Sequence, residues 1–314
     1  MAPDLSPDLA PQSTFELDRM QAPAATPTAT TRRAMLFHEA PLRRAKRAAF
    51  GLLRAVQPAR IAQVPLNARL WLSSLVNPRQ GLPDAAAAPM RFEGVCGIAR
   101  DLSVETLMRA HSRGLHPAAH VGPIKWWSPP ERCVLLFGEF HIASRLRRQM
   151  RQGRHRVTFD RDFDATIAAC AEPRGGRWPV TWITPKLMHA YAALHDAGFA
   201  HSFEVWNEAG ELVGGGYGVA VGGVFVIESQ FSREANTSKM GLTSLIYHLA
   251  HWGFAMADGK GPTPTILDMG FRVIPRGDYL ARLAEVGQKP VRPGRWQAEA
   301  DLKIVAAWEP ERTG

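Results

Sequence analysis

The segment from residue 200 to residue 232 constrains the fold more than any other part of the chain, because short blocks of apolar and small residues alternate there with turn residues. Three strands are predicted, since Asn207–Gly210 and Gly222–Gly223 supply the conformations that tight turns need. Joined by such short turns, the strands are expected to run antiparallel. Their predicted ranges are Ser202–Trp206, Glu211–Val219 and Val224–Ser229.

A helix is predicted directly after these strands, with Asn236 or Thr237 as its cap and a further strand, Phe254–Asp258, behind it. The apolar residues at helical spacing are Leu242, Leu245, Ile246, Leu249 and Trp252. Earlier helices are predicted from Asp101 to Gly114 and from Thr184 to Gly198. A strand meander followed by a helix and a strand predicts an α+β fold.

Three regions are predicted along the chain. Residues 1–90 form a Pro/Ala-rich and basic extension that has little to bury and is expected to be disordered. Its basic stretch, Arg32–Arg54, is either a solvated tail or a basic amphipathic helix for RNA or an anionic membrane surface. Residues 91–142 are expected to form a small N-terminal domain, and residues 143–314 the larger one.

Composition favours an enzyme of a reducing compartment that meets a polyanion. The 314 residues carry 38 Lys and Arg against 29 Asp and Glu, giving a formal net charge of +9. The three cysteines are far apart, form neither a metal spacing nor an even disulfide set, and lead us to expect no metal. No window is apolar enough for a membrane span, so a soluble, cytoplasmic protein is expected.

Two motifs are unusual for a folding core. In Trp126–Pro129 (WWSP) adjacent tryptophans cannot both face one core on a strand, so at least one ring is expected to be free to stack on a flat group. In Glu228–Ser232 (ESQFS) a carboxylate closes the apolar run Gly223–Ile227, which is expected to carry it into a cleft. The other interpretation is a loop Trp pair and a solvated strand-end Glu.

An arginine cluster follows WWSP closely. We expect it to contact the phosphates of an RNA, although a solvated surface remains the alternative. Its members are Arg145, Arg147, Arg148, Arg151, Arg154 and Arg156.

These motifs, taken in order with Ile98–Pro117, Thr181–Thr184 (TWIT) and Ile274–Tyr279 (IPRGDY), make the chain resemble the leucyl/phenylalanyl-tRNA protein transferases from about Gly97 to Leu283. The resemblance implies an N-acetyltransferase-like (GNAT-like) domain behind a small N-terminal domain, and no cofactor. It also implies transfer of a Leu- or Phe-like amino acid from aminoacyl-tRNA to an acceptor protein with N-terminal Arg or Lys, which marks the acceptor for degradation. A monomer is expected.

The resemblance also assigns site residues. Asp258 matches the family's catalytic Asp and Glu228 its active-site Glu, whereas Lys260 stands where the family carries a Gln and Thr265 where it commonly has a His. The positions expected to bind the 3′ adenosine and the aminoacyl group are Trp126, Trp127, Trp182, Gly216, Gln230 and Ser232. Both carboxylates follow apolar strands, which favours a perturbed environment and a role in orienting or deprotonating the amine.

Two other functions stay open at this point. A GNAT-like acyltransferase with another donor is disfavoured, because the turn Phe231–Gly241 has only one glycine with which to cradle a pyrophosphate. A degenerate relative that binds tRNA or protein without chemistry is favoured by Lys260 and Thr265. The altered Gly216 and Gln230 leave the transferred amino acid open.

Overall fold

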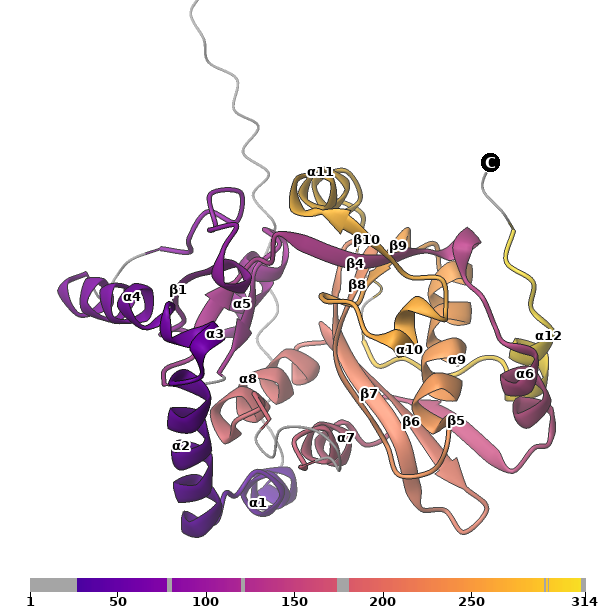
Figure 1. Cartoon of the computed structure of the whole chain (residues 1–314). Helices are drawn as coiled ribbons and strands as arrows, with labels where there is room; N and C mark the ends of the chain where they lie inside the picture. The colour runs from indigo at the N-terminus through magenta and orange to yellow at the C-terminus, as the bar shows by residue number, and fades with distance from the viewer. Residues whose placement is uncertain are drawn as a thin grey trace, which may run out of the picture.

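The computed structural model describes residues 27–77, 81–119, 122–173, 181–290, 292 and 294–311. These residues form a three-stranded sheet of order β1-β3-β2 and a seven-stranded sheet of order β10-β4-β9-β8-β7-β6-β5 (Figure 1). The small sheet contains β1 (Val95–Ile98), β2 (His116–Ala118) and β3 (Lys125–Trp127). The large sheet contains β4 (Glu131–Leu136), β5 (His155–Phe159), β6 (Ala200–Asn207), β7 (Leu212–Val221), β8 (Val224–Ser232), β9 (Met256–Asp258) and β10 (Arg272–Pro275).

The large sheet is mixed. Strands β6, β7 and β8 pair antiparallel through short turns, as the sequence predicted, whereas β8 and β9 are parallel. Parallel neighbours need a crossover connection, and α9 (Thr237–His251) supplies it at the place predicted for a helix. The α+β fold class is thereby confirmed.

Helices cover both faces of the large sheet, so its strands are apolar on both sides (Figure 1). One core lies under α7 (Phe163–Cys170) and α8 (Pro185–Asp196) and includes Val224 and Val226. The other lies under α9, α6 (Ser144–Arg151) and α12 (Leu302–Ala307) and includes Phe225 and Ile227. Alternate residues of β8 therefore enter different cores.

A β-bulge at Glu228 interrupts this alternation. Tyr217 of β7 opposes Ser229, and Gly218 opposes Ile227, which leaves Glu228 as the extra residue of β8. Such a residue bends the strand and redirects a side chain. Glu228 was predicted at a strand end, but β8 continues past it to Ser232, because Gly214–Gly216 extend the ladder.

The predicted boundary at residue 142 falls inside the large sheet. Strand β4 pairs with β9 and β10, so residues 131–136 belong to that sheet and not to a small N-terminal domain. Sequence periodicity did not show this, because β4 meets its partners more than a hundred residues later along the chain.

The predicted disorder of residues 1–90 is wrong for the part that the structure describes, and residues 1–26 lie outside it. Arg33 explains why, since its guanidinium binds Asp164 at 3.0 Å and Asp196 at 2.8 Å and so fixes the first helix on the body. Four helices form: α1 (Pro27–Leu36), α2 (Pro41–Ala55), α3 (Pro58–Ile61) and α4 (Val64–Val76). Composition alone cannot reveal partners so distant in the sequence.

The remaining elements are short or lie at the edges of the large sheet. They are η1 (Phe92–Gly94), α5 (Val104–His111), η2 (Phe137–Glu139), α10 (Pro264–Leu267) and α11 (Arg276–Val286). Within the described ranges, no helix is both long and apolar enough to cross a membrane.

Candidate active site

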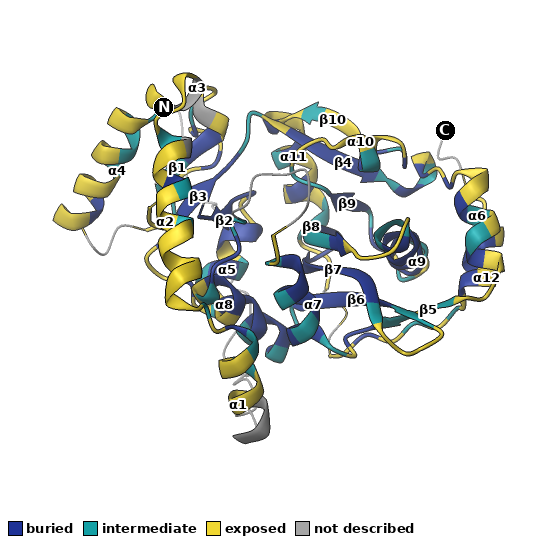
Figure 2. Ribbon diagram, turned by 60° about the horizontal axis from the view of Figure 1, so that its bottom comes forward, coloured by how far each residue is buried: buried dark blue, intermediate teal, exposed yellow. Residues whose placement is uncertain are grey.

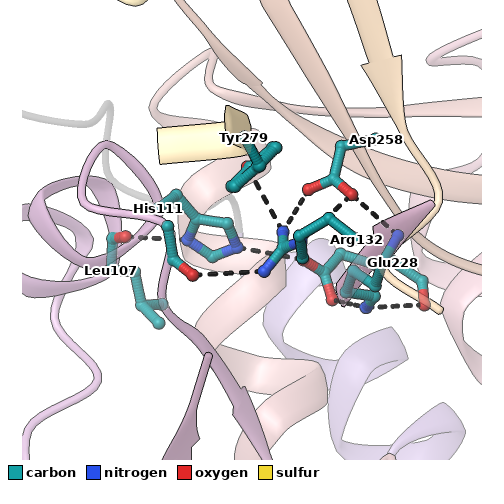
Figure 3. A network of polar contacts seen from close by, with 8 residues as sticks. Leu107, His111, Arg132, Glu228, Asp258 and Tyr279 are labelled. Carbon is teal, nitrogen blue, oxygen red and sulfur yellow. Dashed lines mark hydrogen bonds and ion pairs between the residues drawn. The ribbon is translucent and has the colours of Figure 1, made fainter. Parts of the chain in front are cut away.

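Glu228 lies at the centre of a buried polar cluster between β8, α5 and the β9–α10 connection (Figure 3). Its Oε1 is 2.9 Å from His111 Nε2, and its Oε2 is 2.6 Å from Lys260 Nζ. Burial opposes the negative charge, but the charge of Lys260 and the contact with His111 outweigh it and hold the pKa of Glu228 below its ordinary value. The Glu228 site, meaning Glu228, His111 and Lys260, therefore contains an ionised carboxylate.

A proton is bound between His111 and Glu228. The Nδ1 of His111 lies 2.8 Å from the carbonyl oxygen of Leu107, which only accepts, so Nδ1 carries a hydrogen. The other ring nitrogen faces a carboxylate oxygen, which is also an acceptor unless it is protonated. Since two acceptors repel, the pair shares one proton.

Lys260 sits in a constrained turn. Its φ of 63° is left-handed, which is uncommon for a residue with a side chain. The backbone N–H of Lys260 donates to Asp258 Oδ1 at 2.8 Å, and its carbonyl accepts from the N–H of Cys133 at 2.9 Å. The turn directs the ammonium group to Glu228 and over the ring of Trp182, at 4.9 Å from the ring centroid.

Asp258 is the last residue of β9, and its carboxylate is paired with Arg132. Arg132 forms two contacts with its carboxylate, and Arg132 also donates to the carbonyl of Gly114 at 3.1 Å and to the hydroxyl of Tyr279 at 3.2 Å (Figure 3). Both side chains of the ion pair are fully buried. The carboxylate thus contacts both Arg132 and the backbone N–H of Lys260.

The two neighbouring tryptophans are both buried, so the expectation of one free ring in WWSP is wrong. They do not share a core, as predicted, because they lie on opposite faces of β3. Trp126 packs in the core that lies under α7 and α8, and Trp127 packs in a small cluster with Val95 and Ala118. Trp182 is the half-buried ring of the set and the one that touches the Glu228 site.

The structure does not bring Gly216 and Gln230 to Glu228. They are partners in the β7–β8 ladder, and a side chain at Gly216 would meet Phe203 of the core under α9. They therefore face the other side of the sheet. Ser232 is also elsewhere, since its hydroxyl accepts from the N–H of Ser238 at 2.9 Å in the first turn of α9.

Of the six predicted phosphate-binding arginines, four lie on α6, across the large sheet from the Glu228 site (Figure 1), whereas Arg154 follows that helix and Arg156 lies in β5. Arg147 donates to the carbonyls of Ala306 and Trp308 at 2.7 and 2.9 Å, so it holds the C-terminal segment. The others in this helix or at its end, Arg145, Arg148 and Arg151, are exposed. They are not beside WWSP as expected.

Several residues of the site were not assigned from the sequence. His111 gave the clearest signal, a polar residue on an apolar helix face, whereas Arg132 stands three residues after WWSP and Tyr279 closes the motif IPRGDY. Burial and the charges of Lys260 and Arg132 lower the pKa of His116, and burial and the charge of Glu228 raise that of Tyr191. Both are therefore neutral neighbours of the cluster.

Metal ligands do not gather in the part of the chain that the structure describes: His, Cys, Asp and Glu side chains form no group of three or more there that could hold an ion.

Comparison with known proteins gives two family matches. Residues 134–284 match the leucyl/phenylalanyl-tRNA protein transferase family, and residues 100–130 match the N-terminal domain of the same family. A leucyl/phenylalanyl-tRNA–protein transferase of Alkalilimnicola ehrlichii is 41% identical over 246 residues, which cover 78% of this chain and 95% of that protein. One from Pseudomonas fluorescens is 48% identical over 193 residues, which cover 60% and 84%.

Among solved structures, FemX shares 12% identity at a TM-score of 0.37 over 46% of this chain and 59% of that one, too distant to support an argument. The sequence relatives suffice. The chain belongs to the leucyl/phenylalanyl-tRNA protein transferase family, and the resemblance inferred from its motifs is confirmed. Residues 1–99 lie outside both family matches.

Proposed function

We propose that this protein moves an aminoacyl group from charged tRNA to the N-terminal amine of an acceptor protein. Membership of the family supports the reaction. The finer parts of the proposal are a Leu- or Phe-like amino acid, acceptors that begin with Arg or Lys, and degradation of the tagged product. The protein would act as a cytoplasmic monomer, with the large sheet and α9 forming a GNAT-like fold.

One observation carries the catalytic part of the proposal: a lysine ammonium held by a buried carboxylate over an aromatic ring. Lys260 Nζ contacts both Oε2 and the main-chain oxygen of Glu228, at 2.6 and 3.1 Å. Its side chain keeps 13% of its surface exposed, whereas that of Glu228 keeps none. The cation is thus fixed in direction and still reachable from outside.

The reaction needs little acid–base help. A neutral α-amine attacks the ester carbonyl, negative charge develops on the carbonyl oxygen, and the bond to the ribose 3′ oxygen breaks as that oxygen takes the proton that the amine loses. An α-amine with a pKa of about 7.7 to 8.0 is partly neutral at pH 7, so no strong base is required. A fixed cation near the developing oxyanion is the larger contribution.

Glu228 and Asp258 act through Lys260 in this scheme. Glu228 orients the ammonium group, and the Arg132–Asp258 pair fixes the left-handed turn that carries it. Both are positioning residues. Removing the carboxylate of Glu228 would take away the acceptor that Lys260 Nζ and His111 Nε2 both contact.

A cleft of about 1020 Å³ lies between the N-terminal helices and the start of α8, and we assign it to the tRNA. Arg100 and Lys186 line it from the body, and Arg44 lines it from α2. Thr184, which also lines the cleft, is two residues from Trp182, the ring that Lys260 contacts, so this stretch of chain connects the cleft with the Glu228 site. Phosphates bound there would continue from a 3′ adenosine at Trp182.

Transfer from an acyl-CoA donor is not supported. The only glycine of the turn Phe231–Gly241 packs α9 onto the sheet, since a side chain at Gly241 would meet Phe203 and Val205. Asn236, in a left-handed conformation, precedes the helix without a side-chain cap. The turn therefore offers no row of small residues for a pyrophosphate.

The test is single-turnover transfer from charged tRNA to a peptide that begins with Arg, followed by the mass of the peptide. Lys260→Ala should lower the rate about 10²- to 10³-fold, because it removes a cation from the developing oxyanion. Lys260→Gln should lose less, because an amide hydrogen can still donate to Glu228.

Lys239→Ala is the matched control, since this lysine of α9 makes only a 3.9 Å contact with exposed Asp268. A wild type that binds tRNA but transfers nothing to any peptide would reject the reaction in favour of a degenerate binder. A Lys260→Ala rate equal to that of the control would instead reject the role of the lysine.

A further inference from the structure

Exposed apolar side chains are concentrated in the N-terminal helices. Of the fifteen large hydrophobic residues that are exposed among those described, ten lie between Leu42 and Val76. Leu42, Leu52 and Val76 keep 68%, 66% and 87% of their surface exposed. Scattered exposed leucines are ordinary, but a concentrated set marks a surface with a partner.

Helix α2 is amphipathic, and its apolar side does not face the body of the protein. With 100° between residues, Leu42, Ala49 and Leu53 share one side of the helix, and Leu52 lies next to them. Among the residues of α2 whose burial the structure describes, only Gly51 is buried. In Figure 2 the helix is yellow along nearly its whole length and lies at the rim of the molecule.

The charge of this region is of one sign. Residues 41–76 contain seven Lys and Arg and not one Asp or Glu. Arg43 and Lys46 of α2 are exposed and flank its apolar side, whereas Arg44 turns to the cleft. A basic helix with exposed leucines matches the surface of an anionic bilayer, where apolar side chains enter the acyl boundary and cations meet the headgroups.

The helices are held in place for such a contact. Arg33 of α1 binds Asp164 and Asp196, and Phe37 is buried against the ring of His189. Leu66 and Leu70 pack α4 on the small sheet, which leaves Leu72 and Val76 on its outer side. Both family models match only from residue 100 onward, after these helices.

We propose that α2 and the outer side of α4 dock this protein on an anionic phospholipid surface, without crossing it. RNA fits the outward-facing set poorly, because phosphates gain nothing from aliphatic side chains and Trp71, the one aromatic residue among the ten, lines the cleft instead. A second protein or a second copy of this chain would cover the leucines but gives no reason for the exposed cations Arg43 and Lys46 beside them. The proposal is independent of the transfer reaction.

The experiment is sedimentation of the full chain with vesicles of phosphatidylcholine alone or of phosphatidylcholine with phosphatidylglycerol. Binding is expected only with the anionic vesicles and should weaken as salt rises. Leu52→Glu with Leu53→Glu should reduce the affinity tenfold or more, because two charges replace the inserting leucines. Arg43→Ala should reduce it about fivefold.

Leu267→Glu with Ile304→Glu is the matched control. These two aliphatic residues are also exposed, but they lie in α10 and α12, outside α2 and α4. Retained tRNA binding and an unchanged melting temperature show that each variant is folded. Equal vesicle binding by both double variants would overturn the proposal. Binding of the wild type to vesicles only when tRNA is added would also overturn it. The same holds if the wild type does not bind vesicles but forms a dimer that the Leu52 and Leu53 substitutions dissociate.

Discussion

Two buried carboxylate–histidine pairs lie on different parts of the large sheet, and they do different things. Glu228 meets His111 at 2.9 Å, and Asp160 meets His201 at 2.8 Å, with all four side chains almost completely buried. Each pair joins a carboxylate to a histidine ring, and the two pairs are nearly equal in burial and in distance. What differs is the set of groups that surrounds each pair.

The Asp160 cluster, meaning Asp160, His195 and His201, is closed by the fold itself. The carboxylate accepts from the backbone N–H of Ser202 at 2.8 Å and of Trp296 at 2.7 Å. The ring of His201 stacks on Trp296 with centroids 3.6 Å apart. The cluster thus fastens the C-terminal segment to the start of β6, and the Asp160 charge contacts no mobile side chain.

In the Glu228 site, by contrast, the carboxylate pairs with Lys260, whose side chain is partly exposed. Lys260 is held in a left-handed turn, and its ammonium group contacts the ring of Trp182 as well as the carboxylate. Backbone donors at Asp160 indicate a structural pair, whereas a partly exposed cation at Glu228 indicates a functional one. This difference predicts opposite mutational results.

The largest expected effect is the contrast between neutralising Glu228 and neutralising Asp160. Glu228→Gln should lower single-turnover transfer at least 10²-fold, since Lys260 loses its orienting charge, whereas Asp160→Asn should leave the rate per folded molecule within about twofold. Asp160→Asn should instead lower the free energy of unfolding by about 3–5 kcal/mol, the usual result of removing one partner of a buried ion pair. Urea unfolding and transfer assays on both variants measure the contrast.

Similar losses of rate in the two variants would remove the distinction between the pairs. If the Asp160→Asn protein unfolds too readily for the assay, His201→Gln removes the charge partner and keeps the stacking surface beside Trp296. The same contrast is expected for it: lower stability and an unchanged rate.

The strand meander, α9 and the family were readable from the sequence because each rests on neighbouring residues. Turn residues at Asn207–Gly210 and helical spacing after Asn236 are local signals, and the structure agrees with both. Only part of the site could be predicted from the sequence. Glu228 and Lys260 stood in motifs, but the proton shared with His111 depends on a contact across 117 residues.

Errors arose where a long-range partner overrides composition. The Pro/Ala-rich N-terminal stretch becomes α1 because Arg33 finds two carboxylates on α7 and α8. Arg147 stood in a cluster typical of phosphate binding, yet it holds backbone carbonyls at the C-terminal end. Neither partner is close in sequence, so no window of residues could have shown it.

The next largest expected effect is a dependence of stability on pH that arises near the Asp160 cluster. Burial raises the pKa of Glu204, a neighbour of Asp160, from 4.5 to about 7, although Ser202 and Thr158 donate to it. Because the folded-state pKa is the higher one, the folded protein binds this proton more tightly, and stability is lost as pH rises from about 4.5 to 7. The shift corresponds to about 3 kcal/mol.

Glu204→Gln should therefore flatten the fall in unfolding free energy across that pH window, measured by urea unfolding at half-unit steps. Glu285→Gln on exposed α11 is the control and should keep the wild-type slope. An unaltered slope in Glu204→Gln would mean that the carboxylate is ionised at little cost in the folded protein.

The smallest expected effect compares cations on the two sides of the large sheet. Arg100 and Lys186 line the cleft between the N-terminal helices and α8, whereas Arg145 and Arg148 lie on α6 next to the C-terminal segment. If tRNA follows the cleft, Arg100→Ala with Lys186→Ala should weaken tRNA binding and reduce the log–log salt slope by about one for each lost phosphate contact. Arg145→Ala with Arg148→Ala should change neither quantity. Anisotropy titrations from low to moderate salt separate the two, and a reduced slope in the α6 variant alone would move the tRNA to the other side of the sheet and restore the phosphate-binding role first inferred for those arginines.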